Sequence, residues 1–149
     1  MMERRKFLGL GVALFATVPA SLSALDFRKE KPATWTAKKV DESIKALYGD
    51  IKTVDGDISV KAPKIASNGG AVPVTVKSGL ELKSLAIFQD VNPEAAVAAF
   101  TIPEGAIVNY MFKIKMKGSG EITVIGEGKD GKFYKASQKL EVALGGCEG

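Results

Sequence analysis

The sequence contains no histidine and a single cysteine, Cys147, among its 149 residues. Without histidine, the chain cannot supply an imidazole general base, a Ser-His-Asp or Cys-His catalytic arrangement, or a histidine-ligated zinc site. A single cysteine excludes disulfides within the chain, CxxC pairs and all-cysteine metal cages. We therefore expect no metal and no bound cofactor, and the lone thiol becomes the main candidate for chemistry.

The chain also lacks a large excess of either positive or negative charge. The chain has 21 Lys and Arg against 17 Asp and Glu, and after Arg5 its only arginine is Arg28. The lysines are scattered and no stripe mixes basic with aromatic residues, so we expect no nucleic-acid binding. A hydrophobic content of 46% with 26% charged residues is typical of a soluble globular protein, and the length fits one domain.

Residues 1–24 have the pattern of a secretory signal peptide. The basic residues Arg4, Arg5 and Lys6 precede an apolar run, 7–18, and a segment of small residues follows. This run is well short of the roughly 20 residues that span a bilayer, so we expect no stable membrane anchor. Cleavage is expected after Ser23 or Ala24.

The order Arg4-Arg5-Lys6-Phe7-Leu8 resembles the twin-arginine export motif Arg-Arg-x-Phe-Leu-Lys, with Gly9 in place of the usual lysine. That route carries folded proteins, often with a bound cofactor or with a partner that lacks its own signal. Because the chain offers no cofactor ligands, we expect a partner subunit to be exported with it. The expected location is the periplasm.

The period of the apolar residues predicts one helix followed by strands. Residues 25–35 are charged, contain Pro32 and show no period, which predicts a mobile lead-in. Residues 36–48 have helical spacing and Gly49 follows as a stop, which predicts one amphipathic helix. After Gly49 the period changes to two, which is typical of strands with one buried face.

About seven short strands, separated by turns, predict an all-β, immunoglobulin-like antiparallel sandwich over residues 36–144. Leu85–Phe88 is apolar on both faces, which indicates a central strand, and Pro73 favours an edge strand or a bulge. Asp130-Gly131 predicts a two-residue hairpin link. The expected strands are 58–62, 72–76, 85–88, 97–102, 108–116, 122–127 with its hairpin partner 133–138, and 140–144.

The last five residues, Gly145-Gly146-Cys147-Glu148-Gly149, predict a flexible C-terminal arm. A cysteine is usually a small buried hydrophobe, but three glycines and a glutamate give it nothing to bury against. Two alternatives remain, a functional exposed thiol or an intermolecular disulfide. Cys147 lies three residues past Leu144, so its sulfur can reach about 10 Å beyond the last strand.

The thiol has no activating neighbour in the sequence. At an ordinary cysteine pKa near 8.5, only about 3% is thiolate at pH 7. The negative charge of Glu148 disfavours the thiolate further. We infer that other enzymes act on Cys147 and that this chain is not itself an enzyme.

Two stretches and two motifs together resemble the SoxY family, the sulfur-carrier subunits of bacterial thiosulfate oxidation. The motifs are Gly145-Gly146-Cys147 and the twin-arginine signal with Arg4, Arg5, Phe7 and Leu8. The stretches are Ala66-Ser67-Asn68-Gly69-Gly70-Ala71-Val72-Pro73-Val74-Thr75-Val76 and Phe88-Gln89-Asp90-Val91-Asn92-Pro93.

The resemblance implies that Cys147 is the covalent attachment point for sulfur intermediates, with Gly145, Gly146, Glu148 and Gly149 as its swinging arm. It implies a c-type cytochrome that attaches thiosulfate oxidatively, a manganese hydrolase that releases sulfate, and a dehydrogenase for the sulfane sulfur. It also implies a heterodimer with a second sandwich subunit, SoxZ, which lacks a signal. The family usually has glycine where this chain has Glu148.

The sequence leaves room for two other functions. A structural or adhesive sandwich could use Cys147 for an interchain disulfide. Copper handling through Met111 and Met116 is disfavoured, because a spacing of five puts the two side chains on opposite faces of a strand. The aromatic residues Tyr110, Phe112 and Phe133 fit the core pattern.

Overall fold

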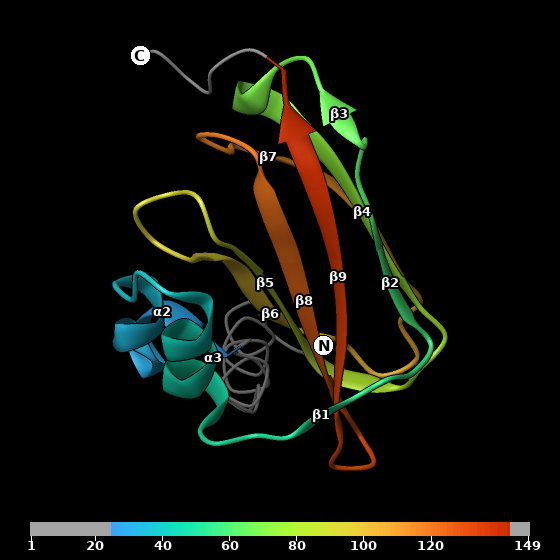
Figure 1. Ribbon diagram of the computed structural model, residues 1–149. Helices are drawn as coiled ribbons and strands as arrows, with labels where there is room; N and C mark the ends of the chain where they lie inside the picture. The colour runs from blue at the N-terminus through green and yellow to red at the C-terminus, as the bar shows by residue number, and fades with distance from the viewer. Residues whose placement is uncertain (1–24, 144–149) are drawn as a thin grey trace, which may run out of the picture.

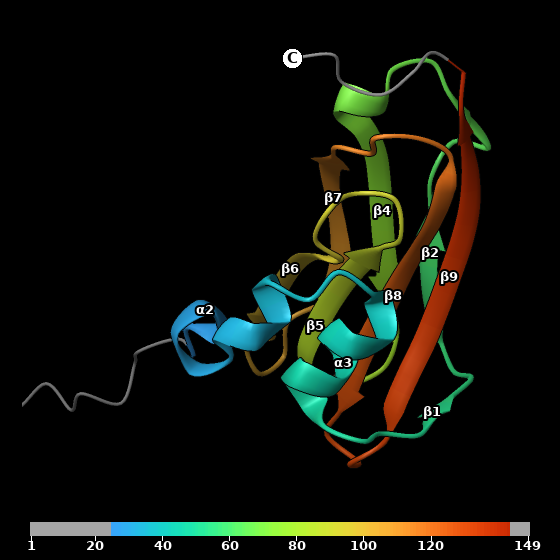
Figure 2. The same cartoon turned by 60° about the vertical axis from the view of Figure 1, so that its left-hand side comes forward.

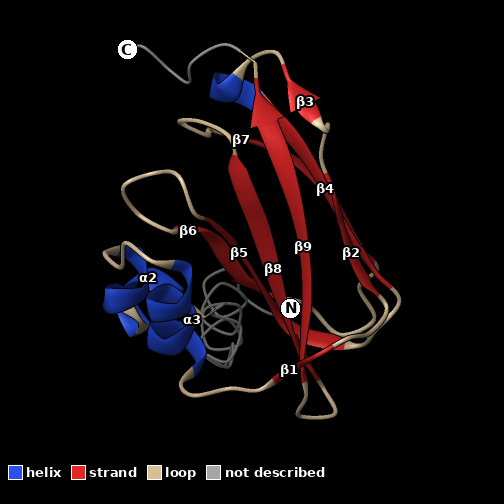
Figure 3. Cartoon of the chain, viewed as in Figure 1, coloured by secondary structure: helices blue, strands red, loops and turns tan. Residues whose placement is uncertain are grey.

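The computed structural model describes residues 25–143. Over this range two β-sheets pack face to face, and short helices lie on the outer face of the larger sheet (Figures 1 and 3). The expected immunoglobulin-like sandwich is confirmed, with nine strands where about seven were expected. The strands are β1 (Thr53–Val54), β2 (Ile58–Lys61), β3 (Ile65–Ala66), β4 (Val72–Ser78), β5 (Leu82–Gln89), β6 (Ala96–Thr101), β7 (Val108–Ile114), β8 (Gly120–Gly128) and β9 (Phe133–Val142).

The larger sheet has the strand order β1-β9-β8-β5-β6, with β3 also beside β9, and the smaller sheet has the order β2-β4-β7. The short strands β1 and β3 run parallel to β9, while the remaining pairs are antiparallel. The period-two alternation places one face of each sheet in the shared core. In β4, for example, Val72, Val74 and Val76 are fully buried.

β5 is a central strand with both faces covered, as its apolar run predicted. Leu85 and Ile87 belong to the core between the two sheets. Ala86 and Phe88 belong to a second cluster, on the other face, that packs under the helices. Figure 2 shows the helices lying against this outer face. A stretch with two buried faces requires apolar residues on both, and Leu85–Phe88 has them.

The segment 25–35 is not the mobile lead-in that the sequence suggested. It forms α2 (Phe27–Glu30) and a 3₁₀ turn, η1 (Pro32–Trp35). The side chain of Phe27 is buried under the sheet, and the indole N–H of Trp35 donates to the carbonyl of Phe27 at 3.2 Å. Phe27 and Trp35 thus give this segment a fixed structure, which its charged composition did not indicate.

The amphipathic helix α3 (Val40–Tyr48) begins four residues later than expected. Thr36 closes the preceding 3₁₀ turn, and Lys39 has an extended backbone at the start of α3. Asp41 and Glu42 occupy the first turn of α3, where negative charge is favourable to the helix dipole. Lys38 and Lys39 precede this turn. The expected stop at Gly49 is confirmed by its positive φ of 81°.

A chain of hydroxyls fastens the end of α3 to the larger sheet. Ser84 donates its single hydroxyl proton to Glu127 Oε2 at 2.8 Å. The Tyr48 hydroxyl, 2.9 Å from Ser84 Oγ, must then be the donor in that pair. Burial raises the pKa of Tyr48 to about 12, and the carboxylate of Glu127 adds to this rise.

This raised pKa predicts an alkaline loss of stability. Below the ordinary tyrosine pKa near 10, both the folded and unfolded states keep the proton and the contribution is complete. As the pH rises from 10 towards 12, the unfolded chain ionises first and the free energy of unfolding falls. We expect the wild type to lose about 1–2 kcal/mol more than Tyr48→Phe between pH 9 and pH 11 in denaturant titrations. Equal losses in both proteins would contradict the assignment.

The hairpin between β8 and β9 is confirmed, but its loop has three residues, Lys129–Gly131, where two were expected. The N–H of Gly128 donates to the carbonyl of Lys132 at 2.8 Å, which closes the loop, and Gly131 takes a φ of 82°. Asp130 accepts from the Tyr134 hydroxyl at 2.6 Å, and this bond holds the pKa of the Asp130 carboxyl below its usual range. β9 continues without a break to Val142, whereas two separate strands were expected there.

Pro73 lies in β4, the middle strand of the smaller sheet, and still occupies an edge-like position. β2 pairs with β4 only from Thr75 to Ser78. At Pro73, therefore, β4 has a partner on one side only, namely Lys113 of β7. On the side without a partner strand, the missing N–H of Pro73 removes no hydrogen bond from the sheet. This is the edge position that the sequence predicted for Pro73.

Candidate functional site

The end of β9 is held by three backbone contacts close to the position where the predicted arm begins. The N–H of Glu141 donates to the carbonyl of Lys64 at 2.8 Å, and the N–H of Ala143 donates to the carbonyl of Ala66 at 2.9 Å. Between them, the N–H of Val142 donates to Ser119 Oγ at 2.9 Å. The last described residue of the chain is thus a fixed point of the sandwich (Figure 1).

β3, the short strand that pairs with the end of β9, is followed by a glycine-containing turn that fixes its position. β3 leads into η2 (Gly69–Ala71), whose first turn is capped by Asn68, because its side chain accepts from the N–H of Gly70 at 2.8 Å. The carbonyl of Gly69 accepts from the N–H of Met116 at 2.7 Å, which ties this turn to the chain between β7 and β8. The stretch 66–76, which carried the family resemblance, therefore builds the support of the β9 terminus.

The loop between β5 and β6 is organised around a buried glutamine. Gln89 is 1% exposed, and its Oε1 accepts from the N–H groups of Val91 and Asn92 at 2.8 and 2.6 Å. Its Nε2 donates to the carbonyl of Glu94 at 2.7 Å. One side chain thus satisfies three backbone groups that the turn would otherwise leave unpaired, so the loop keeps one shape.

The same loop reaches across to the chain between β7 and β8. Asn92 Nδ2 donates to the carbonyl of Lys115 at 2.7 Å, and Asn92 Oδ1 accepts from the N–H of Lys117 at 2.8 Å. Asp90 accepts from the N–H of Glu121 at 2.8 Å. Both stretches of family resemblance therefore lie in the same loop cluster, around the end of β9.

A hollow of about 550 Å³ lies beside the end of β9. Its charged side chains have mixed sign, with Lys64 and Lys139 opposite Asp90, Glu121 and Glu141. Leu140 also lines the hollow and is itself 3% exposed. The remaining lining residues are Ser119 and Gly120. The surface around the arm base is thus mixed in charge.

The residues that the sequence singled out for function lie outside the described residues. These are Cys147 with its arm Gly145, Gly146, Glu148 and Gly149, and the export signal with Arg4, Arg5, Phe7 and Leu8. Leu144, taken as the end of the last strand, also lies outside, and the described part of β9 ends at Val142.

Sequence reasoning missed the supporting network. The sequence marked Gln89, Asp90 and Asn92 only through the family resemblance, although together they fix the loop cluster around the β9 terminus. The available signal was an Asn-Pro pair directly after a strand that is apolar on both faces. A glutamine at the buried end of such a strand needs a polar partner, and backbone groups of the turn are the nearest ones.

The two methionines occupy opposite faces, as their spacing predicted. Met116 is fully buried, and the side chain of Met111 is 79% exposed. Between residues 25 and 143, no group of three metal-ligating side chains is assembled. Over the same range no helix has the length and apolar character needed to cross a membrane.

Comparison with known proteins identifies relatives of the fold and of the sequence. A family model described as sulfur oxidation protein SoxY matches residues 44–147, a range that includes Cys147. Among solved structures, the sulfur carrier protein SoxY from Chlorobium limicola f thiosulfatophilum aligns with a TM-score of 0.64 and 29% identity. This alignment covers 71% of the present chain and 97% of that protein.

A superoxide reductase (neelaredoxin) from Ignicoccus hospitalis aligns with a TM-score of 0.51 and 17% identity, covering 58% of this chain and 80% of that one. At that identity the likeness concerns the fold alone. A search of curated proteins gave no significant match. The family model spans more than half of the chain, and the SoxY structure shares its architecture over nearly that structure's whole length. The chain belongs to the SoxY family of sulfur oxidation proteins.

Proposed function

We propose that this protein is a periplasmic, covalent sulfur carrier of thiosulfate oxidation, with Cys147 as the attachment point. The observation that carries the proposal is the family match, which runs through the sandwich and reaches Cys147 itself. The relative from Chlorobium limicola is described as a sulfur carrier protein, and it matches the present fold over 97% of its length. Cys147 is also the only thiol in the chain.

The anchored end of β9 supports an arm of defined reach. Cys147 lies four residues beyond Ala143, so a fully extended chain carries the sulfur at most about 14 Å from that fixed point. Three N–H groups hold the strand up to Ala143. A thiol on such a tether can enter an enzyme cleft while the sandwich stays outside.

The proposed loading step joins a thiolate to thiosulfate. The Cys147 thiolate and the outer sulfur of thiosulfate form an S–S bond, and two electrons leave to a c-type cytochrome. Because only about 3% of an ordinary cysteine is thiolate at pH 7, the loading enzyme must supply the base or the positive charge that activates it. The carrier contributes position, and the partner contributes activation.

The proposed release step is a hydrolysis. Water attacks the sulfonate sulfur, the S–S bond to that sulfur breaks, and sulfate leaves with two protons, so that a persulfide remains on Cys147. A manganese hydrolase of the pathway is the proposed catalyst, and a dehydrogenase is the proposed oxidant of the remaining sulfane sulfur. No residue of the described sandwich is needed as a catalyst in this scheme.

Export and partner choice belong to the same proposal. We assign residues 1–24 as a twin-arginine signal with Arg4, Arg5, Phe7 and Leu8 as its core, and we propose a SoxZ-like sandwich subunit as the stable partner. Export of a folded heterodimer needs only one signal. Deleting the signal should therefore remove both subunits from the periplasm, and periplasmic recovery of the partner in that strain would contradict joint export.

The loading assay tests the function directly. Purified protein is incubated with thiosulfate, the c-type cytochrome and an electron acceptor, and the free thiol at Cys147 is counted by alkylation. The thiol should disappear only when all components are present, and a reductant should restore it. A thiol that stays free while the cytochrome turns over would contradict the carrier role, whereas a covalent dimer of the chain would indicate a structural disulfide.

Glu148 is expected to slow loading modestly. Its negative charge lies next to Cys147 in sequence and repels the thiosulfate dianion, but water and salt screen the effect. We expect Glu148→Gly and the isosteric Glu148→Gln to load about two- to fivefold faster at low salt, with the advantage vanishing at high salt. Faster loading by the glycine variant alone would assign the effect to bulk in the arm. Unchanged rates in both would show that the charge has no role.

A further inference from the structure

β6 is the terminal strand of the larger sheet, and among the described residues no strand lies on its other side. All six of its residues are half-buried, and none of them is charged or proline. Natural edge strands normally carry charges, prolines or bulges that prevent pairing with another chain. The only irregularity is a register shift between Ile87 and Phe88 of β5, which leaves Val97 near the start of β6 without a partner. The stretch from Ala98 to Thr101 is an unprotected edge.

The hydrogen-bond pattern shows which backbone groups this edge offers. The N–H of Ile102 donates to the carbonyl of Lys83 at 2.8 Å, one step beyond the last paired residues of β5 and β6. Residues of an antiparallel strand alternate between facing the partner and facing away from it. The N–H and C=O groups of Ala99 and Thr101 therefore point away from β5, ready to pair with an added strand, whereas Val97 lies at the register shift and has no partner in β5.

A hollow of about 310 Å³ runs along this edge, between β6 and the start of α2. Trp35 and Val97 to Ala99 give it an apolar lining, and Arg28 contributes a positive charge, its guanidinium lying 4.1 Å from the centre of the Trp35 ring. Asp26 also lines the hollow.

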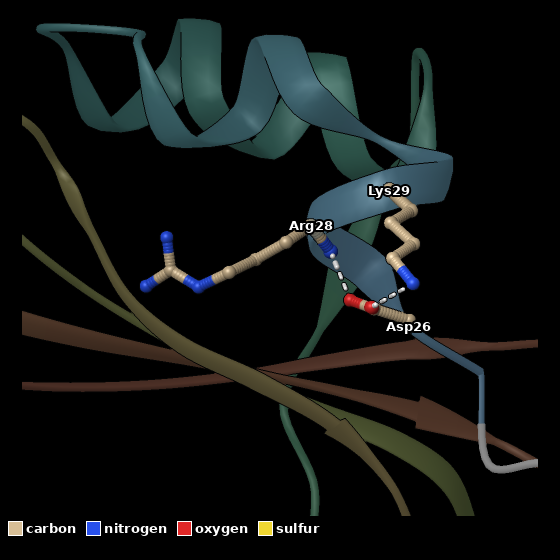
Figure 4. A network of polar contacts seen from close by, with 3 residues as sticks. All are labelled: Asp26, Arg28 and Lys29. Carbon is tan, nitrogen blue, oxygen red and sulfur yellow. Dashed lines mark hydrogen bonds and ion pairs between the residues drawn. The ribbon is translucent and has the colours of Figure 1, made fainter.

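Within residues 25–143, no carboxylate lies within ion-pair distance of Arg28. The carboxylate of Asp26 is engaged with the N–H of Arg28 at 3.1 Å and with Lys29 Nζ at 3.8 Å. Figure 4 shows the Arg28 side chain extending away from that carboxylate. The hollow can therefore bind a negatively charged group beside Arg28.

The other flank of the edge is apolar as well. Phe100 of β6 and Tyr110 of β7 stack edge to face with ring centroids 5.5 Å apart, which joins the edges of the two sheets.

We propose that the β6 edge is the docking surface for the second sandwich subunit, which adds an extended strand with an acidic side chain facing Arg28. Main-chain bonds to Ala99 and Thr101 continue the larger sheet into the partner, and the Arg28 ion pair fixes the register. This inference rests on the proposed function for the existence of a SoxZ-like partner. It adds the surface and the mode of binding.

The sharpest variant is Ala99→Pro, which removes one outward-facing N–H and leaves the bonds between β5 and β6 intact. Ala99→Ser is its matched control, because it changes the same side chain and keeps that N–H. With a purified SoxZ-family subunit as the probe, we expect Ala99→Pro to raise the Kd at least tenfold and Ala99→Ser less than threefold. Arg28→Glu should also raise the Kd at least tenfold, with a smaller effect at high salt.

Hydrogen exchange on the wild type gives a test that needs no variant. On complex formation, the amides of Ala99 and Thr101 should gain protection, while those of Ala98 and Phe100, already bonded to β5, should change little. Unchanged exchange at both outward amides, or equal binding by Ala99→Pro and wild type, would overturn the inference. A gain in protection that requires only a second copy of this chain would overturn the choice of partner.

The two proposals fail separately. Loss of the β6 docking mode leaves the thiol chemistry of Cys147 to be measured in the loading assay. A Cys147 that never carries sulfur leaves the Kd and exchange measurements unaffected.

Discussion

Cys147→Ser is expected to abolish thiosulfate-dependent turnover completely. A serine hydroxyl cannot form the S–S bond on which the proposed loading step depends, and the chain has no second thiol to replace it. No partial activity from neighbouring groups is expected, because oxidative attachment has no alternative acceptor on this chain. The measurement is cytochrome reduction with thiosulfate in the reconstituted system, with turnover below about 1% of wild type.

The same variant should fold and bind its partner normally. Residue 147 lies beyond the contacts that fasten β9 at Glu141, Val142 and Ala143, so the melting temperature and the Kd for the SoxZ-like subunit should match the wild type. Glu148→Gln, which alters the neighbouring side chain and keeps the thiol, is the matched control and should remain active. Sustained turnover by the serine variant would contradict covalent carriage.

Deleting Gly145 and Gly146 is expected to reduce turnover at least about a hundredfold. The deletion shortens the arm by about 7 Å, half of its maximum reach from Ala143. A misplacement of only 1 Å at a reacting atom can cost about a hundredfold in rate. Each partner enzyme should be affected, because each must take in the same thiol. The rates of loading and of sulfate release are measured separately on the reconstituted system.

The control for this deletion keeps the length of the arm. Replacing both glycines with alanine preserves the reach while reducing backbone freedom, and we expect a loss of less than about tenfold. The comparison separates reach from flexibility. A deletion variant that turns over within a factor of about three of the wild type would show that the enzymes do not depend on the length of the arm.

Much of the fold could be predicted from the sequence because its strands follow the simplest patterns. The alternation in β4 and the doubly apolar run of β5 identified buried faces correctly, since each buried position must be filled by an apolar side chain. Asp130-Gly131 located the hairpin, although the loop is one residue longer than expected. Local rules work where a residue's role depends on its immediate neighbours.

The misses came from contacts between segments distant in sequence. The segment 25–35 looks unstructured by composition, yet Phe27 packs under β5 and the Trp35 indole bonds to its carbonyl. The short strands β1 and β3 have too few residues for any period, and only their pairing with β9 defines them. Gln89 likewise gains its role from a turn that folds back over it.

The candidate site divides in the same way. The thiol and its glycines could be recognised from composition and resemblance, because a lone cysteine between glycines has few structural uses. The clamp at the arm base could not, since Ser119, Lys64 and Ala66 reach β9 only in the folded sandwich. The β6 edge could not be anticipated either, because being terminal is a property of the sheet and not of the strand.

Intact-mass analysis of the protein from cells grown on thiosulfate tests the central claim most directly. The account predicts forms heavier than the bare chain by added sulfur or by a thiosulfonate group. Treatment with reductant should return them to the bare mass, and fragmentation should place the addition on Cys147. A protein that carries no addition at Cys147 under active thiosulfate oxidation would contradict the account.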